Sequence, residues 1–482
     1  MAKKEIHSVH FIGIGGIGMS GIALVAKAQG MQVSGSDLRH SSIIKQLKKN
    51  GIKIYIGNRE ENIASGKDKP DIVVVSTAIM DHNPELKAAK DAKIPIWHRA
   101  ELLAYLGRNK KTLAVTGTHG KTSTSSMLAS ALHQIGDDPS FLIGGVVRPF
   151  GTNAQYGDGE YYVVEADESD KSFTYLSPYA AIITNIEADH LDHYKDMNEI
   201  YDKFEDFIKL LPKNGLAVCS GDDAELTKIT KKVAKNVITY GFGDNCDAKI
   251  SKYKTSGVGC TFKLDLPVFK VGKSKRKEPV SFDCSLPKNP GIHYAENAAS
   301  VVVLLDALGY DAKKVVEALE NFGGIKRRFD VIGSEAGVTV VDDYAHHPTE
   351  IAATVKAAFE LDFKNVHVIW QPHRFSRIGL FRDIFNDEFA HAFDGCKTVT
   401  FTNVYGAGEV PVPGVTGYSF LKIVKDKAGK KSPKTHYVPH RLEIVDHICG
   451  IAEDGDLVIT MGAGDITSMA PQILQALKEK SK

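Results

Sequence analysis

Short, continuous apolar segments recur along the chain, and segments with helical periodicity, such as SSIIKQLKKNG and PTEIAATVKAAFE, lie between them. The apolar segments are rich in β-branched residues and do not alternate with polar ones, which is typical of parallel strands covered on both faces. This repeated order of strand and helix predicts α/β domains with open, mostly parallel sheets, and more than one of them. The predicted strands lie within HSVHFIGIG, PDIVVVSTA, KTLAVTGT, EYYVVEAD, YAAIITNIEADH, GVTVVDDYAHH, NVHVIWQPHR, KTVTFTNVY and GDLVITMGAG.

Polar residues follow almost every predicted strand. The strand ends read GIGG, THGK, EADESD, EADH, DDYAHH, QPHR and GAGD. In open α/β sheets, ligands bind outside the carboxyl ends of the strands. We therefore expect the chemistry of this protein at these strand ends.

Length and composition narrow the class of protein. The chain has 482 residues, with 60 Lys and Arg against 59 Asp and Glu, and at about 150 residues per domain this length predicts about three domains. The balanced charge argues against a nucleic-acid partner or an anionic-membrane surface. No apolar stretch approaches the roughly 18 residues that a membrane span needs. The six cysteines show no CxxC or zinc spacing, which favours reduced thiols in a cytoplasmic protein.

Two polar, glycine-containing segments predict the domain boundaries. Residues 106–112 (LGRNKKT) and 321–329 (NFGGIKRRF) have the composition of linkers. They predict domains 1–107, 108–324 and 325–482. Residues 245–285 depart from the strand–helix rhythm and predict an antiparallel addition to the second domain, and the basic run 273–277 within them is interpreted as a solvated loop.

The segment VTGTHGKT (115–122) follows a predicted strand and opens a predicted helix. Backbone amides at such a turn, together with the helix N-terminus, hold phosphates. Lys121 would reach the β- and γ-phosphates, and the Thr122 hydroxyl would bind Mg²⁺. The full motif has a glycine where this chain has Val115, so the pattern predicts a shortened phosphate loop; a chance helix start is the alternative.

A second glycine loop, GIGGIG (13–18), follows the first predicted strand, and Asp37 lies about 20 residues further on. This is the dinucleotide-binding fingerprint, which taken alone favours NAD. The same geometry holds any diphosphate at a helix N-terminus, so a nucleotide sugar fits as well. A purely structural tight turn is the third interpretation.

Acids and a histidine follow the strands of the second domain. Four acids fall within EADESD (165–170), and a divalent cation would relieve their repulsion. His190 ends the next strand beside two further acids and could face the same centre. The alternatives are a solvated acidic loop and a structural histidine.

Arginines and histidines follow the strands of the third domain. Arg327 and Arg328 lie just past Gly323-Gly324, and DDYAHHP (342–348) and QPHRFSR (371–377) each end a strand. The planar guanidinium matches carboxylate and phosphate oxygens. These strand ends therefore predict a site for anionic groups.

The ordered motifs GIGGIGM, TGTHGKT, EADESD, TNIEADHLD, RRFD, DDYAHHPTE, QPHRFSR and GAGDI resemble the Mur ligase family, and the resemblance covers nearly the whole chain. It implies three α/β domains: a Rossmann-like UDP-sugar domain, a central ATPase with a mostly parallel sheet, and a C-terminal Rossmann-like domain that binds the amino acid and closes the site. It implies ATP-dependent ligation of an amino acid to UDP-N-acetylmuramate through an acyl phosphate, with ATP and two Mg²⁺ ions. The QPHRFSR segment is most similar to members that add L-alanine, and a peptide-recycling ligase is the alternative within the family.

The resemblance also implies roles for matching residues. The expected nucleotide contacts are Thr116, Gly117, Thr118, His119, Gly120, Lys121, Thr122, Ser123, His293, Asn297, Arg327 and Asp343. The expected substrate contacts are Gly15, Gly16, Gly18, Ser36, Asp37, Ser76, Tyr344, His346, Arg374 and Arg377. The expected metal ligands are Thr122, Glu165 and His190. The expected catalytic residues are Lys121, His190, Arg327 and His346.

One segment departs from the family. The adenine segment H-N-x-x-N reads His293-Tyr294-Ala295-Glu296-Asn297 here, so Tyr294 replaces an asparagine, and its ring could stack on the base. The base for the attacking amine stays open between His346 and His190. A monomer or weak homodimer is expected. From other classes, an NAD-dependent dehydrogenase would explain the first glycine loop and Asp37, and a nucleotide-gated binding protein would bind nucleotide without turnover.

Overall fold

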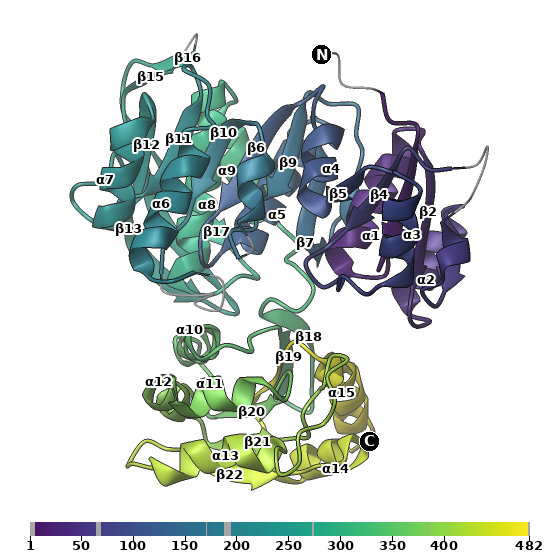
Figure 1. Cartoon of the computed structure of the whole chain (residues 1–482). Coiled ribbons are helices and arrows are strands. Elements are labelled where there is room, and N and C mark those ends of the chain that lie inside the picture. The colour runs from purple at the N-terminus through teal and green to yellow at the C-terminus, as the bar shows by residue number, and fades with distance from the viewer. Residues whose placement is uncertain are drawn as a thin grey trace. The chain divides into compact units, whose positions relative to one another are not determined.

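Three large sheets with flanking helices and one two-stranded sheet make up the described part of the fold. Figure 1 shows the helices and strands along the whole chain. The computed structural model describes residues 5–63, 69–169, 171–187, 194–271, 274–383 and 385–480. The chain divides into two compact units. Unit 1 comprises Met1–Lys252, Phe262–Cys284 and Ala295–Phe322, and unit 2 comprises Tyr253–Thr261, Ser285–Tyr294 and Gly323–Lys482. The predicted α/β class with three sheets is confirmed, whereas the boundaries after residues 107 and 324 stay a prediction.

The N-terminal sheet has five parallel strands in the order β3-β2-β1-β4-β5. Phe11 on β1 and Val74 on β4 are fully buried, which explains why these strands read as continuous apolar runs. The strands are β1 (Ser8–Ile12), β2 (Gln32–Asp37), β3 (Lys53–Ile56), β4 (Ile72–Val75) and β5 (Ile96–His98). The helices are α1 (Ile17–Ala28), α2 (Ser42–Lys49), α3 (Pro84–Asp91) and α4 (Arg99–Leu106).

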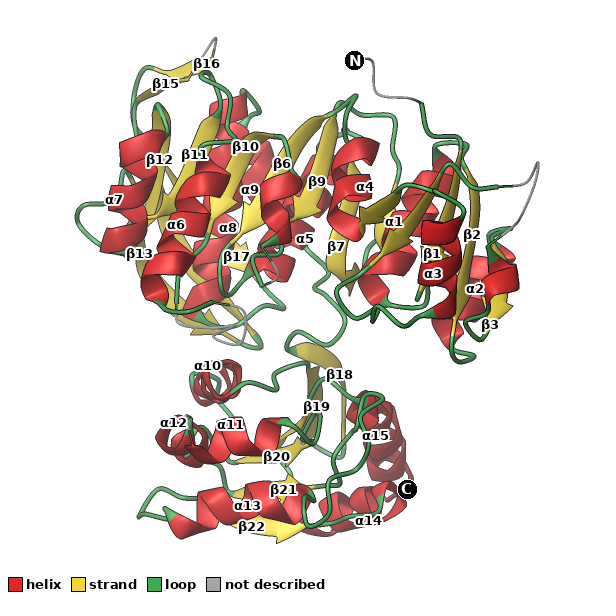
Figure 2. Cartoon of the chain, viewed as in Figure 1, coloured by secondary structure: helices red, strands yellow, loops and turns green. Residues whose placement is uncertain are grey.

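The central sheet has ten strands in the order β17-β14-β13-β12-β11-β10-β6-β9-β7-β8. Strands β6, β9 and β10, which precede the predicted phosphate and acid motifs, are parallel neighbours. Figure 2 shows α6 and α7 on one face of this sheet and α8 and α9 on the other. The strands are β6 (Lys111–Thr116), β7 (Ser140–Val147), β8 (Thr152–Gln155), β9 (Tyr161–Glu165), β10 (Pro178–Ile183), β11 (Leu216–Ser220), β12 (Asn236–Gly241), β13 (Ala248–Ser256), β14 (Gly259–Leu266) and β17 (Val280–Leu286). The helices are α5 (Lys121–Gln134), α6 (Met197–Ile208), α7 (Ala224–Val233), α8 (Ile292–Leu308) and α9 (Ala312–Glu320).

The basic run corrects one expectation. Residues 274–276 are not a loop, because they form strand β16 (Ser274–Arg276), although Lys275 at its centre is exposed. This strand pairs antiparallel with β15 (Phe269–Val271), as predicted for residues 245–285. Arg276 donates from Nε to Asp306 Oδ2 at 3.0 Å, near the C-terminal end of α8. No local sequence pattern predicts this ion pair, because its partners lie 30 positions apart in the chain.

The C-terminal sheet has six strands in the order β18-β19-β23-β20-β21-β22, parallel except for the β18–β19 pair. Trp370 on β20 is fully buried, and its ring centroid lies 5.0 Å from that of Phe389. The strands are β18 (Asp330–Glu335), β19 (Val338–Asp343), β20 (Val366–Trp370), β21 (Thr398–Phe401), β22 (Lys434–Tyr437) and β23 (Leu457–Met461). The helices are α10 (Pro348–Phe359), α11 (Arg377–Asp383), α12 (Asn386–His391), α13 (Gly417–Asp426), α14 (Arg441–Ile451) and α15 (Met469–Lys480).

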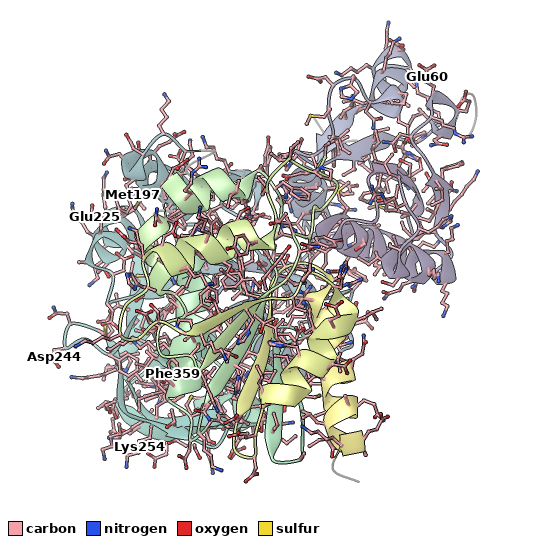
Figure 3. All side chains as sticks on the ribbon, turned by 90° about the horizontal axis from the view of Figure 1, so that it is seen from below. Glu60, Met197, Glu225, Asp244, Lys254 and Phe359 are labelled. Carbon is pink, nitrogen blue, oxygen red and sulfur yellow. The ribbon has the colours of Figure 1, made fainter. Side chains whose placement is uncertain are left out.

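The surface is polar. Asp244, in the turn after β12, projects outward from unit 1 in Figure 3, with its side chain 92% exposed. Within the described ranges, no helix combines the length and apolarity needed to cross a bilayer.

Candidate functional site

The predicted phosphate loop lies between β6 and α5, and its glycines are required by the geometry. Gly117 has φ of 135°, and a Cβ there would lie 2.0 Å from the Thr184 hydroxyl oxygen. Gly120 has φ of 83°, and a Cβ there would lie 2.8 Å from Asn297 Oδ1. Both positions combine left-handed backbone with a close neighbour, so a side chain at either would distort the loop.

The segment after β10 holds this loop from one side. The backbone amides of Thr118 and His119 donate to the carbonyl and side-chain oxygens of Asn185, at 3.0 Å and 2.8 Å. Gly120 is the N-cap of α5, and no side chain caps that helix. The first amides of α5 therefore face outward from an uncapped helix terminus, which is the arrangement that binds phosphate.

Lys121 lies inside the loop. Its Nζ donates to Gly117 O and to Glu168 Oε1, both at 2.7 Å, and its side chain is 14% exposed. Burial opposes the charge, but the adjacent Glu168 carboxylate raises the pKa of Lys121 above its usual value. The loop therefore holds a permanent cation at neutral pH.

Thr122 and Glu165 are brought together as predicted for metal ligands, because β6 and β9 are neighbours. The Thr122 hydroxyl donates to Glu165 Oε1 at 2.9 Å, and Glu165 Oε2 accepts from Gly144 N at 2.7 Å. A hydroxyl and a carboxylate are hard oxygen donors that suit Mg²⁺. The third expected ligand, His190, lies outside the described residues. Among the residues described, no three acidic, histidine or cysteine side chains form a metal site by themselves.

Different groups surround the amides of the N-terminal glycine loop. Gly13 N and Ile14 N each donate to Ser36 O at 2.9 Å, and Gly15 N donates to Asp37 Oδ2 at 2.9 Å. Gly16 caps α1 without any side-chain contribution. The loop thus presents an uncapped helix terminus beside one carboxylate, as the fingerprint predicts for a bound diphosphate.

The two serines predicted for the UDP moiety are placed differently. Ser36 is fully buried, and its hydroxyl donates to Glu85 Oε2 at 2.8 Å. Its carbonyl accepts hydrogen bonds from two amides of the glycine loop, so Ser36 helps to fix the conformation of that loop. Ser76 follows β4 and is half-buried, and its carbonyl accepts from Ile79 N at 3.1 Å.

Arg99 was missed by the sequence reasoning. It begins α4, and its Nη2 donates to Asp167 Oδ2 at 3.0 Å. Its Nη1 lies 3.5 Å from the position of a Cβ on Gly18. Burial raises the pKa of Asp167, but Lys121 and Arg99 together lower it to about 2. Arg99 follows the end of β5, so the rule that strand ends carry function was sufficient to find it.

The adenine segment occupies the first turns of α8. Asn297 is 4% exposed and packs against Gly120 of the phosphate loop. His293 lies four positions earlier, on the same helix face. Tyr294 is 3% exposed, and its hydroxyl donates to Arg328 O at 3.1 Å. Tyr294 is thus committed to a packing contact in unit 2, and nothing in that contact favours stacking on a base.

In unit 2, Arg327 is held in a strained position. Its backbone has φ of 65°, its Nη2 donates to Gly464 O at 3.0 Å, and its guanidinium carbon lies 4.9 Å from the centre of the Tyr344 ring. The contact with Gly464 joins the RRFD and GAGD motifs. Left-handed backbone at a non-glycine residue is uncommon and clusters at functional sites.

Asp343 lies at the end of β19 and is buried. Its Oδ2 accepts from Phe329 N at 2.7 Å, and its Oδ1 accepts from Ala345 N at 2.8 Å. Burial raises the pKa of Asp343 to about 6. These bonds fix the backbone shortly after Arg327 and directly after Tyr344. A direct contact of Asp343 with a nucleotide stays a prediction.

The histidines and arginines after β19 and β20 gather into one cluster. The His346 and His373 ring centroids are 5.8 Å apart, and Tyr344 lies 5.3 Å from His346. Burial lowers the pKa of His373 to about 4, and the charges of His346, Arg377 and Arg374 act in the same direction. The two predicted motifs therefore meet at one edge of the C-terminal sheet, where their positive charges suit a carboxylate.

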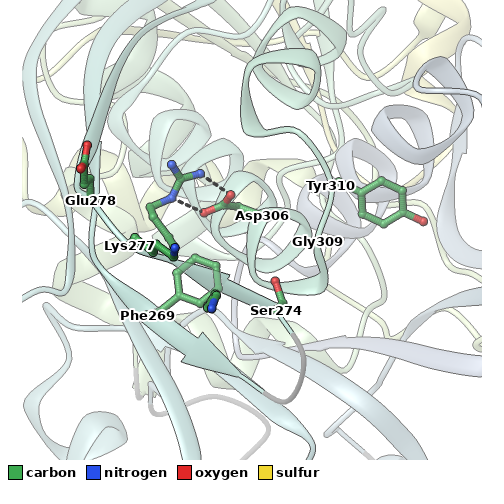
Figure 4. Close-up of a pocket in the computed structure, with 9 residues that line it drawn as sticks. Phe269, Ser274, Lys277, Glu278, Asp306, Gly309 and Tyr310 are labelled. Atoms are coloured by element: carbon green, nitrogen blue, oxygen red, sulfur yellow. Dashed lines mark hydrogen bonds and ion pairs between the residues drawn. The ribbon is translucent and has the colours of Figure 1, made fainter.

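An open cavity of about 640 Å³ lies elsewhere on unit 1, beside the β15–β16 hairpin. Asp306, which Figure 4 labels on the wall of this cavity, accepts a hydrogen bond from Arg276 Nε. Its lining residues are Phe269, Ser274, Lys275, Arg276, Lys277, Glu278, Asp306, Gly309 and Tyr310. None of them is a predicted site residue, and the Arg276–Asp306 pair already neutralises much of its charge.

Comparison with known families gives three consecutive matches. The Mur ligase family, catalytic domain, matches residues 8–111; the Mur ligase middle domain matches residues 115–305; and the Mur ligase, glutamate ligase domain, matches residues 327–464. The matched ranges together cover the phosphate loop, the acid strand end and the arginine cluster.

Individual proteins are similar over nearly the full length. The UDP-N-acetylmuramate–L-alanine ligase of Carboxydothermus hydrogenoformans is 42% identical over 475 residues, which are 98% of this chain and 97% of that protein. The enzyme of the same name from Geotalea uraniireducens is 41% identical and covers 98% of this chain and 99% of its own. The structure of a UDP-N-acetylmuramate–alanine ligase from Thermotoga maritima superposes with a TM-score of 0.79 at 29% identity, over 98% of this chain and 100% of that one. A murein peptide ligase from Psychrobacter arcticus superposes with a TM-score of 0.69 at 25% identity, over 98% and 99%.

Proposed function

Because the chain belongs to the Mur ligase family, we infer that it joins L-alanine to the lactyl carboxylate of UDP-N-acetylmuramate at the expense of ATP. Relatives that are about 40% identical over 98% of the chain carry the name of this activity. The observation that carries the proposal is the phosphate loop with Lys121 buried against Glu168. A dehydrogenase has no use for this loop, whereas a ligase that consumes ATP requires it.

The chemistry explains why ATP is needed. A carboxylate does not react with an amine at neutral pH, because oxide is a very poor leaving group. A carboxylate oxygen of the substrate attacks the γ-phosphorus of ATP, the bond to the β–γ bridging oxygen breaks, and ADP leaves. The amine of L-alanine then attacks the acyl carbon of the acyl phosphate, and inorganic phosphate leaves. The amine loses a proton in this step, so the products are the amide, ADP and phosphate.

Charge control is the main demand on the protein, since a triphosphate and a carboxylate must approach each other. Lys121 supplies a fixed positive charge at the β- and γ-phosphates, and the uncapped N-terminus of α5 supplies backbone donors. Such preorganised groups stabilise the transition state electrostatically.

The donor set at Thr122 and Glu165 fits Mg²⁺, and these two residues would hold it. Bound there, Mg²⁺ would neutralise phosphate oxygens and polarise the transferred group. We propose His190 as a ligand of a second ion. The oxygen ligands on β9 and α5 come from rigid elements, which keeps their spacing constant.

The N-terminal glycine loop is proposed to bind the UDP moiety with Gly15, Gly16 and Gly18, at the N-terminal end of α1. Asp37 would contact the ribose, as the fingerprint implies. Ser36 supports the loop through its carbonyl, and Ser76 lies at the neighbouring strand end. This loop holds no lysine, so it binds a diphosphate without activating it.

In unit 2, Arg374 and Arg377 are proposed to bind the carboxylate of L-alanine and the product, together with Tyr344 and His346. Arg327 is proposed to contact the nucleotide phosphates, and Asp343 the ribose. The attacking amine must be neutral, while a free α-amino group has a pKa of about 8. His346 or His190 would accept its proton.

The cellular setting is part of the proposal. All six cysteines are free thiols within the described residues, as expected for a reducing compartment. We propose a cytoplasmic enzyme in peptidoglycan precursor synthesis that acts as a monomer or weak homodimer. Its small-molecule partners are UDP-N-acetylmuramate and L-alanine.

The test is release of ADP and phosphate by the purified full chain. We expect release only when ATP, Mg²⁺, UDP-N-acetylmuramate and L-alanine are all present, with a product whose mass equals the sum of sugar and alanine minus water. NAD should cause no change in nicotinamide absorbance. Turnover with a murein tripeptide but not with L-alanine would assign the chain to the recycling reaction instead.

A further inference from the structure

Two loops of unit 2 meet at the arginine turn, which we define as residues 372–377 after β20. The partner segment, residues 405–409, follows β21, the neighbouring strand. Arg374 N donates to Tyr405 O at 2.8 Å, and Tyr405 N donates to Pro372 O at 2.8 Å. The rings of His373 and Tyr405 also stack, with centroids 5.8 Å apart. One end of the arginine turn is thus held by a short backbone ladder.

A carboxylate holds the other end. Glu409 accepts from the Ser376 hydroxyl at Oε1, 2.7 Å away, and from the Ser376 amide at Oε2, 3.0 Å away. A tight turn directs Glu409 toward this position, because its own amide donates to Gly406 O at 2.8 Å. A Cβ on Gly406 would lie 2.9 Å from the Phe375 ring, so a glycine is needed where the two loops pack.

The arginine turn needs such support. Arg374 has φ of 71°, a left-handed conformation that a side-chain-bearing residue adopts only where its surroundings enforce it. Ser376 lies between the two arginines of the turn, and Arg377 begins α11 directly after it. Fixing both the amide and the hydroxyl of Ser376 therefore fixes the directions in which Arg374 and Arg377 leave the backbone.

The charge of Glu409 persists in this setting. Partial burial acts to raise its pKa, but the donors of Ser376 and Phe375 and the charge of Arg374 hold the pKa below its usual value. A charged carboxylate forms stronger hydrogen bonds than a neutral amide does. A glutamine at this position would keep one acceptor oxygen and lose the second, which faces the Ser376 amide or hydroxyl.

We propose that Glu409 is a positioning residue for amino-acid binding: through Ser376 it orients Arg374 and Arg377, and it does not contact L-alanine itself. This inference rests on the proposed function, which assigns the two arginines to the amino acid and product. It predicts that loss of the Glu409–Ser376 contact weakens L-alanine binding and leaves the phosphoryl transfer machinery of unit 1 intact.

The experiment compares Glu409→Gln, Ser376→Ala and the double variant of the full chain at saturating ATP and UDP-N-acetylmuramate. We expect each single variant to raise the KM for L-alanine about 10-fold, with kcat and the KM for ATP within about threefold of the unchanged chain. The double variant should raise the KM for L-alanine no more than about twice as far as either single variant, because both changes weaken the same contact. Ser376→Thr keeps the hydroxyl, so its KM for L-alanine should be close to that of the unchanged chain.

Asp383→Asn is the matched control. Asp383 is also an acid near α11, but it is 58% exposed and pairs with Arg382 at 2.7 Å, away from the arginine turn. Its substitution should leave every constant unchanged.

Hydrogen exchange of the free protein provides a readout that needs no turnover. Exchange in the peptide covering residues 372–377 should be faster in Glu409→Gln than in the unchanged chain, and unaltered in Asp383→Asn. Unaltered exchange in Glu409→Gln would overturn the proposal, even if the unchanged chain were inactive and the proposed function had failed. If the unchanged chain is active, an unaltered KM for L-alanine in Glu409→Gln would also overturn the proposal. A raised KM in Glu409→Gln together with an unaltered KM in Ser376→Ala would overturn it as well, because Glu409 would then contact the substrate directly.

Discussion

The two glycine loops of unit 1 hold the same place between a strand and a helix, and they differ in the side chains around them. Each follows a strand that is parallel to both of its neighbours, and each opens a helix whose N-cap is a glycine with no side-chain bond. Helices α2 and α3 of the same unit are capped by the side chains of Ser41 and Asn83. A missing side-chain cap on a ligand-facing helix leaves its amides available to an anion.

The difference lies in the side chains around the amides. The phosphate loop encloses Lys121 against Glu168 and sets Thr122 against Glu165. The N-terminal loop has a single carboxylate, Asp37, that accepts from Gly15 N. We therefore propose that an uncapped helix N-terminus serves catalysis where a cation and hard oxygen ligands surround it, and serves binding alone where they do not. Substitutions in the first loop should change kcat, and substitutions around the second should change the KM for the UDP-sugar.

The largest effect is expected from Lys121→Ala. Removing one preorganised charge-stabilising group commonly costs about 3–4 kcal/mol in the barrier, so kcat should fall by at least about 100-fold. Phosphate release under saturating substrates measures it. Lys111→Ala is the control, because Lys111 forms an exposed pair with Glu160 at the other end of β6. A folded Lys121→Ala protein with near-normal kcat would contradict the catalytic role proposed for the phosphate loop.

Glu165→Gln should have the next largest effect. The amide keeps one oxygen but loses the charge that makes Glu165 a metal ligand, so we expect the Mg²⁺ concentration for half-maximal rate to rise about 10-fold. A Mg²⁺ titration of turnover measures it, and Glu160→Gln at the opposite end of the β9 segment is the control. An unchanged Mg²⁺ requirement would show that Thr122 and Glu165 do not bind the metal.

Gly15→Ala should act on the second loop. The added methyl would lie 2.6 Å from Asp37 Oδ2 and displace that carboxylate from the Gly15 amide. We expect the KM for UDP-N-acetylmuramate to rise about 5- to 10-fold, equivalent to about 1 kcal/mol, with kcat unchanged. Gly429→Ala, whose methyl would meet no atom within 4 Å, is the control. A fall in kcat with a constant KM for UDP-N-acetylmuramate in Gly15→Ala would contradict the proposal that this loop serves binding alone.

Ser36→Ala should have the smallest kinetic effect. Its hydroxyl is buried on Glu85, so its loss should cost about 1 kcal/mol of stability, which lowers Tm by about 2–4 °C. The KM for UDP-N-acetylmuramate should change less than about twofold, because the loop contact is made by the Ser36 carbonyl. A large rise in that KM with an unchanged Tm would mean that the hydroxyl binds the substrate directly.

Much of the fold follows from local sequence. The continuous apolar runs predict buried parallel strands because burial on both faces leaves no polar alternation, and β19 and β20 are indeed buried at every position. The rule that function gathers at strand ends explains why Lys121, Thr122 and Glu165 meet.

The remainder depends on contacts between distant residues. Acids lie at the end of β9 and directly after it, and no local pattern shows that Glu168 faces Lys121 while Asp167 faces Arg99. The direction of the Ser36 side chain likewise depends on Glu85, 49 positions away. The sequence predicts Arg276 in a solvated loop, and this prediction is wrong because its partner, Asp306, lies on a helix later in the chain. Such pairings are properties of the tertiary fold, so a single sequence cannot specify them.

The central claim is that one anion receives the terminal phosphoryl group of ATP at the Lys121 loop. It is tested most directly with UDP-N-acetylmuramate carrying ¹⁸O in its lactyl carboxylate, in a complete reaction with ATP, Mg²⁺ and L-alanine. Our account predicts that one ¹⁸O atom per turnover appears in the released inorganic phosphate and that the amide product retains the other. Unlabelled phosphate formed alongside amide product would contradict it.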